Sequence, residues 1–144
     1  MTAARQPIMN EKDLQDFLAR EFPQVRHLDM RVEQVDAHAI RIRMPVEDRH
    51  LRPGGTVSGP TLMTLADAGT YLLILAQIGP VALAVTTSLT INFLRKPAAT
   101  QDILVEARLL KLGRRLAVGE VSLFSEGVAE PVAHATVTYS IPPK

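Results

Sequence analysis

The longest apolar run of the sequence extends over residues 58–78 and predicts a helix. Pro60 suits its first turn, and Gly79-Pro80 ends it. At about 3.6 residues per turn, apolar side chains cover nearly the whole circumference, which is typical of a membrane span or of a helix wrapped by its own protein. Polar residues, Asp67 among them, interrupt the run before it reaches the roughly 18 apolar residues of a membrane span. We therefore expect a core helix that carries one acid.

Alternation of apolar and polar residues predicts strands on both sides of this helix. Before it, LDMRVEQV and AIRIRMPV flank residues 36–38 as a hairpin. After it, short breaks separate four stretches rich in Val, Leu, Ile and Thr, at residues 82–95, 101–112, 115–126 and 131–141. Short breaks favour an antiparallel meander, because parallel neighbours need crossovers of a dozen or more residues. In the first of these stretches we expect Val85, Thr87, Leu89, Ile91 and Phe93 on a core face and Thr86, Ser88, Thr90 and Asn92 on a polar face.

The remaining segments complete one domain. Residues 1–10 are expected to be a loose tail, and a short helix follows as far as Arg20 or Glu21. The polar segment 47–55 ends in Pro-Gly-Gly and is expected to be an exposed loop. The order of elements predicts a single α+β domain over residues 1–144, in which about six antiparallel strands wrap around the long helix.

Composition and charge exclude several classes of protein. The 144 residues carry 16 Lys and Arg against 15 Asp and Glu, without a long basic run, which argues against nucleic-acid binding. There is no cysteine, so disulfides and thiolate chemistry are excluded. The four histidines form no ligand cluster, so we expect no metal site, and we expect His50 and His134 at the surface or in strands. Without a leader-like N-terminus or a membrane span, a cytoplasmic protein is expected.

Residues 55–67, GTVSGPTLMTLAD, and residues 91–95, INFLR, resemble the hotdog-fold thioesterases of the phenylacetate-degradation (PaaI-like) type. The resemblance extends over roughly residues 30–141. It implies a hotdog fold, in which an antiparallel sheet wraps around a long helix, and subunits that form dimers or dimers of dimers. It also implies hydrolysis of acyl-coenzyme A thioesters at the subunit interface. Coenzyme A is then part of the substrate, and no separate cofactor is implied.

The same resemblance assigns catalytic roles to three residues. Asp67 aligns with the acid that activates a water or attacks the thioester carbonyl, Gly59 with the glycine whose N–H polarises that carbonyl, and Thr86 with a supporting hydroxyl beside the water. An N–H at a helix start has no internal partner and lies at the positive end of the helix dipole. Gly59 and Asp67 lie about 12 Å apart along one helix, too far to flank one carbonyl. The family solves this with a composite site, one residue coming from each subunit.

Further residues are predicted to bind substrate, and three of them depart from the family pattern. Ser58 replaces a common histidine, Pro60 a second glycine, and Arg52 an asparagine or glutamine. Pro60 has no N–H for a second oxyanion contact, and Arg52 can donate hydrogen bonds but cannot accept one. The predicted binding set also contains one hydroxyl and three basic residues, the latter for the phosphates of coenzyme A: Ser88, Arg95, Lys96 and Arg114.

Other functions stay open at this point. A non-catalytic protein that binds acyl-CoA or an acyl carrier is favoured by the departures at Ser58, Pro60 and Arg52. A purely structural oligomerisation domain predicts no stabilisation by any ligand. Dehydration or hydration of acyl thioesters usually pairs a histidine with an acid, and the central motif contains no histidine.

Overall fold

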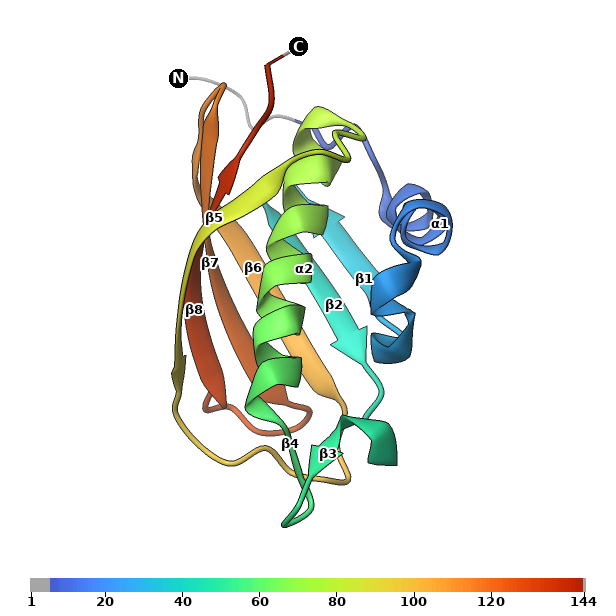
Figure 1. Cartoon of the computed structure of the whole chain (residues 1–144), viewed down its shortest axis with the longest axis vertical. Coiled ribbons are helices and arrows are strands. Elements are labelled where there is room, and N and C mark those ends of the chain that lie inside the picture. The colour runs from blue at the N-terminus through green and yellow to red at the C-terminus, as the bar shows by residue number, and fades with distance from the viewer. Residues whose placement is uncertain (1–5, 144) are drawn as a thin grey trace.

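A computed structural model describes residues 6–143, in which a curved sheet wraps around one long helix (Figure 1). The helices are α1 (Glu11–Glu21) and α2 (Gly59–Ile78), with the 3-10 turns η1 (Pro23–Leu28) and η2 (Asp48–His50). The strands are β1 (Arg31–Asp36), β2 (Ala39–Met44), β3 (Leu51–Arg52), β4 (Thr56–Val57), β5 (Val85–Phe93), β6 (Ile103–Leu112), β7 (Leu116–Ser125) and β8 (Ala133–Ser140). The predicted hotdog fold, with its short first helix, hairpin and long helix, is confirmed.

The six long strands form one antiparallel sheet in the order β1-β2-β6-β7-β8-β5, and β3 and β4 form a separate small hairpin. The predicted meander of four consecutive strands is therefore wrong at its first strand. Only β6, β7 and β8 follow one another in space, whereas β5 pairs with β8 at the far edge. The reason is that β6 pairs with β2 on one side and β7 on the other, so no place beside β6 is left for β5.

Helix α2 fills the concave face of the sheet. A Cβ added at Gly69 would stand 3.2 Å from Val105 Cγ1, so this glycine permits close contact between helix and sheet. Among residues 6–143, α2 is the helix long and apolar enough to cross a membrane, but 72% of that span is buried inside the fold. One strip of α2 stays open: Pro60 and Met63 are exposed, and Thr64 and Asp67 are half-buried. The prediction that protein surrounds the helix on all sides is wrong along this strip.

The two edge strands of the sheet, β1 and β5, differ in whether their outer backbone groups are covered. On β1, side chains of α1 take up backbone groups: Gln15 Oε1 accepts from the Val32 N–H at 3.0 Å, and a Glu11 carboxylate oxygen accepts from the Val35 N–H at 2.8 Å. On β5, no element described in residues 6–143 covers the outer edge, and most of the strand is exposed (Figure 1). An uncovered edge presents unpaired N–H and C=O groups, so β5 is the edge ready to pair with another strand.

A β-bulge near Thr87 reverses the faces to which the side chains of the first β5 residues point. Thr86 lies opposite Tyr139, and Ser88 lies opposite Thr138, so three residues of β5 face two of β8. The extra residue reverses the alternation, because side chains of successive strand residues point to opposite faces. Thr86 therefore shares the helix-facing side with Leu89, and its predicted place on the polar face with Ser88 is wrong.

Two segments predicted to be irregular are ordered by contacts. The N–H groups of Ile8 and Met9 both donate to the Ala76 carbonyl, at 2.7 and 3.1 Å, and Asn10 caps α1. The loose tail predicted over residues 1–10 is thus wrong for residues 8–10, while residues 1–5 lie outside the described part. The segment 47–55 is exposed at most of its residues, as predicted, but it is not an irregular loop: it contains η2, β3 and the turn before β4, and its His50 is buried.

Candidate functional site

Asp67 receives two hydrogen bonds on one carboxylate oxygen. Thr86 Oγ1 donates to Asp67 Oδ1 at 2.5 Å, and the Tyr139 hydroxyl donates to the same oxygen at 2.7 Å. The Tyr139 hydroxyl also lies 3.0 Å from the backbone carbonyl of Asp67. Within residues 6–143 no hydrogen bond reaches Oδ2 of Asp67. That oxygen is therefore available to take a proton from water or to attack a carbonyl carbon.

Tyr139 is a site residue that the sequence analysis missed. Its side chain is buried, and its ring stacks on Tyr71 with centroids 6.0 Å apart and planes at 29°. Burial raises the pKa of Tyr139 strongly, and the neighbouring Asp67 carboxylate raises it further, so the phenol remains a hydrogen-bond donor. A signal was present in the sequence, because Tyr139 continues the apolar alternation of β8 and a buried tyrosine hydroxyl needs a partner.

Gly59 presents its N–H outward from the start of α2. The Ser58 carbonyl accepts the Leu62 N–H at 3.2 Å and therefore points along the helix. In a trans peptide the N–H of the next residue points the opposite way, so the Gly59 N–H is directed out of the helix start. No hydrogen bond within residues 6–143 uses this N–H. The Phe93 ring lies close by, because a Cβ on Gly59 would stand 3.3 Å from Phe93 Cζ.

Three of the predicted binding residues lie at the start of α2. Ser58 is the helix cap, and its Oγ accepts the Thr61 N–H at 3.2 Å. Pro60 is exposed in the first turn. Arg52 is exposed on the hairpin that leads into the helix, where its Nε donates to the Pro53 carbonyl at 3.2 Å.

The other predicted binding residues are spread over the sheet. Arg95 and Lys96 are exposed just after Phe93, at the end of β5 that adjoins Gly59. Arg114 lies in the β6–β7 turn, two residues before Leu116. Leu116 pairs with Ser140, which also pairs with Val85, so Arg114 lies toward the Val85 end of β5. Ser88 faces the convex side of the sheet, away from Asp67, so the structure does not bring it into the site.

The two catalytic candidates lie toward opposite ends of β5. Gly59 approaches Phe93 at the last residue of the strand, whereas Asp67 is bonded to Thr86 near the first. Gly59 and Asp67 are eight residues apart within α2, which is about 12 Å along the helix axis. One chain therefore does not place both groups on one carbonyl, in agreement with the separation predicted along the helix.

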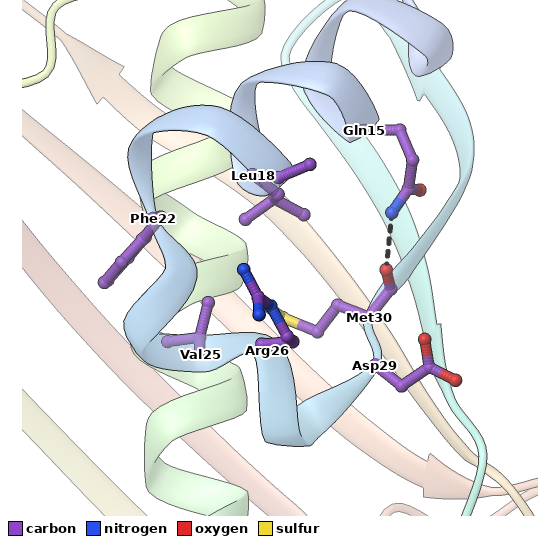
Figure 2. A pocket seen from close by; sticks show the side chains of 8 residues that line it. Gln15, Leu18, Phe22, Val25, Arg26, Asp29 and Met30 are labelled. Carbon is purple, nitrogen blue, oxygen red and sulfur yellow. Dashed lines mark hydrogen bonds between the residues drawn. The ribbon is translucent and has the colours of Figure 1, made fainter.

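Two cavities of the chain lie away from this site. One of about 200 Å³ lies between α1, η1 and the start of β1, where Gln15 Nε2 donates to the Met30 carbonyl at 2.8 Å (Figure 2). Another of about 420 Å³ lies on the convex face over β1, β2, β6 and β7. Neither is lined by Asp67 or Gly59. Residues 6–143 contain no cluster of three or more His, Asp or Glu side chains placed to hold a metal ion.

Comparison with known proteins decides the family. The model of the thioesterase superfamily matches residues 54–132, more than half of the 144 residues. The chain belongs to the thioesterase superfamily. The matched segment of this superfamily member includes Gly59, Asp67 and Thr86, whereas Tyr139 lies beyond it. Among curated proteins, none matches the sequence.

Solved structures agree with this membership of the thioesterase superfamily. The chain is 48% identical to a candidate thioesterase from a Silicibacter species, with a TM-score of 0.89 over 97% of this chain and 96% of that one. It is 28% identical to a variant of the phenylacetic acid degradation protein PaaI from Thermus thermophilus, with a TM-score of 0.73 over 83% and 99% of the two chains. Zebra fish thioesterase superfamily member 2, at 23% identity and a TM-score of 0.79 over 92% and 95%, shares the fold. The resemblance seen in the sequence is confirmed.

Proposed function

We propose that this protein is an acyl-CoA thioesterase that hydrolyses an acyl-coenzyme A thioester to the free acid and coenzyme A. The observation that carries the proposal is the Asp67 carboxylate, whose Oδ1 is fixed by Thr86 and Tyr139 while Oδ2 stays free on an open strip of α2. Membership of the thioesterase superfamily supports the same reaction class.

The complete site is proposed to form between two copies of the chain. If two β5 edges pair antiparallel about a two-fold axis, the Phe93 end of one strand meets the Thr86 end of the other. Gly59 of the second copy then approaches Asp67 of the first, and the same contact is repeated on the other side of the axis. The uncovered edge of β5 and the exposed Val85 and Phe93 support this pairing. Two such dimers can associate further, as the family resemblance implies.

Two routes are open for the chemical step. As a general base, Asp67 takes a proton from water through Oδ2, and the hydroxide attacks the thioester carbon. As a nucleophile, the same oxygen attacks that carbon, and water later cleaves the anhydride. In both routes negative charge develops on the carbonyl oxygen, where the Gly59 N–H of the second copy stabilises it. The C–S bond then breaks, and the coenzyme A thiolate leaves and is protonated.

The basic residues near the helix start are proposed to hold the phosphates of coenzyme A. Arg52, Arg95 and Lys96 lie at the Gly59 end of the strip and are exposed. Arg114 lies at the Asp67 end of its own chain, which antiparallel pairing places next to the Gly59 end of the second copy. We place the reaction in the cytoplasm, with acyl-CoA as a small-molecule substrate and no separate cofactor.

The test is release of free thiol from short, medium, long and aryl acyl-CoA esters by the wild type, Asp67→Asn and Asp16→Asn. Asp16 is exposed on α1 and pairs with Lys12, so its substitution is a matched control for the loss of one carboxylate. We expect at least one ester class to be turned over by the wild type and by the control. Asp67→Asn should lower kcat by about 10²–10⁴-fold, because a positioned base or nucleophile is lost.

Two other outcomes would overturn the proposal. If no ester is hydrolysed but some raise the melting temperature, the protein is an acyl-CoA binding module, as the departures at Ser58, Pro60 and Arg52 suggest. If hydrolysis survives unchanged in Asp67→Asn, the carboxylate has no part in the reaction.

A further inference from the structure

We infer that His50 is a positioning residue, which fixes the direction of the Gly59 N–H by anchoring the β3–β4 hairpin to η1. The inference rests on the proposed function, because it concerns the oxyanion donor of that site. His50 was expected at the surface or in a strand, but its side chain is 1% exposed. A buried polar side chain with this little exposure requires partners for both ring nitrogens.

Both ring nitrogens of His50 have a backbone partner. Nδ1 accepts the Glu47 N–H at 3.0 Å, and Nε2 lies 2.7 Å from the His27 carbonyl oxygen. A carbonyl can only accept, so Nε2 carries the proton and donates it, and the ring is the neutral form with the proton on Nε2. The Glu47 bond is local, whereas the His27 bond joins two segments that are 23 residues apart in the chain.

The anchor is connected to the oxyanion donor by backbone bonds. The His50 carbonyl accepts the Ser58 N–H at 3.0 Å, which closes the base of the β3–β4 hairpin. Ser58 is the cap of α2, and the peptide group that joins Ser58 to Gly59 carries the N–H in question. The path from η1 to this N–H therefore consists of the His50 ring, one backbone hydrogen bond and one peptide unit.

Few other polar contacts hold this hairpin to the rest of the chain. Each of its strands has only two residues, and its turn is closed by the Gly55 N–H and the Arg52 carbonyl. Thr56 Oγ1 donates to the Pro97 carbonyl at 3.2 Å, and Val57 is buried. Without the His50 bond the hairpin keeps its apolar contact but loses its link to η1. A shift of about 1 Å in the Gly59 N–H is enough to lower the rate of the chemical step.

The histidine allows a matched pair of variants. His50→Gln places an amide N–H near the position of Nε2 and can keep the bond to the His27 carbonyl. His50→Asn places an amide oxygen near Nδ1 and can keep only the local bond to the Glu47 N–H. A third variant, Val121→Ala, removes volume from the buried core on β7, outside both the hairpin and η1, and reports the effect of lower stability alone.

Acyl-CoA hydrolysis and amide hydrogen exchange are measured on all three variants and on Asp67→Asn, well below their melting temperatures. We expect His50→Asn to lower kcat by about 10–100-fold with KM little changed, because the lost interaction acts in the transition state. His50→Gln should stay within about threefold of the wild type. Amides of residues 51–61 should exchange faster in His50→Asn and not in His50→Gln or Val121→Ala.

The outcomes separate this inference from the proposed function. Equal kcat and equal exchange in His50→Asn and His50→Gln would overturn the positioning role, even if the wild type is an active thioesterase. If the wild type hydrolyses no ester, the proposed function fails, and the exchange of residues 51–61 still decides whether His50 fixes the start of α2. A loss of kcat in Val121→Ala as large as in His50→Asn would show that lower stability alone explains the effect.

Discussion

Removing the hydroxyl of Tyr139 should change stability in a way that depends on pH. Tyr139→Phe keeps the buried ring and its stacking on Tyr71 but removes the hydrogen bond of 2.7 Å to Asp67 Oδ1. A hydrogen bond to a charged acceptor contributes about 1.5–3 kcal/mol. Asp67 is half-buried and can regain water, which favours the lower part of that range. We expect the variant to be less stable than the wild type by about 2 kcal/mol near neutral pH.

The difference between the two proteins should shrink at high pH. In the unfolded wild-type chain Tyr139 loses its proton near pH 10, whereas burial raises the pKa of Tyr139 in the folded chain. Above about pH 10 the folded state thus binds more protons than the unfolded state, and wild-type stability falls by about 1.4 kcal/mol per pH unit from this group. Phenylalanine has no proton to lose. A gap of about 2 kcal/mol should therefore close roughly 1.5 pH units above pH 10.

Denaturant unfolding at a fixed protein concentration, followed by circular dichroism at several pH values, measures this gap. Concentration is held fixed because association changes the apparent stability. The burial-raised pKa of Tyr71 is common to both proteins, so its contribution cancels in the comparison. A gap that stays constant up to pH 12 would refute the reasoning, because the Tyr139 hydroxyl would then titrate alike in the folded and unfolded chains. A gap near zero at neutral pH would mean that the hydrogen bond to Asp67 contributes nothing.

Three further substitutions test the site. Thr86→Val removes the other donor to Asp67 Oδ1 and should lower kcat about tenfold. Because Thr86 and Tyr139 donate to the same oxygen, the losses of Thr86→Val and Tyr139→Phe should not add in the double variant, and additive losses would contradict this coupling. Ser88→Ala should leave kcat/KM within about twofold, since Ser88 faces the convex side, and a larger loss would return it to the site. Val85→Lys places a charge on the open edge of β5 and should shift the protein toward monomer in analytical ultracentrifugation. Hydrolysis should be lost together with the dimer, and an active monomer would exclude the composite site.

The periodicity of the sequence was sufficient to predict the two α-helices, the first hairpin and the approximate limits of the six long strands, but not the β3–β4 hairpin or the 3-10 turns. Those features depend on neighbours in the chain, and residues 58–80 carry both the start and the stop signals of the long helix. The order of the strands was not predicted, because the place of β5 beside β8 depends on which edges β2 and β6 leave free. The open strip of α2 was also missed, since an apolar circumference does not indicate which side lacks a neighbour.

The candidate site was predicted in part. Asp67 and Gly59 followed from the helix and from the family motif. The family resemblance assigned Thr86 a supporting role, but the alternation of apolar and polar residues placed its side chain on the wrong face of the sheet. The cause is the β-bulge near Thr87, whose extra residue cannot be recognised from the alternation pattern. Tyr139 was missed because it lies 72 residues from Asp67 in the chain, and only the packing of α2 against β8 brings the two together.

The contacts between α1 and β1 have a consequence for how far the protein can assemble. A sheet with two uncovered edges can add a new chain at each end without limit, as amyloid-forming segments do. Here Gln15 and Glu11 occupy backbone donors on the β1 edge, so under the proposed pairing only β5 can add a second chain, and no free edge is left once two β5 strands have paired. In the proposed dimer the first helix, which takes no part in the proposed chemistry, therefore limits assembly through the sheet to two chains.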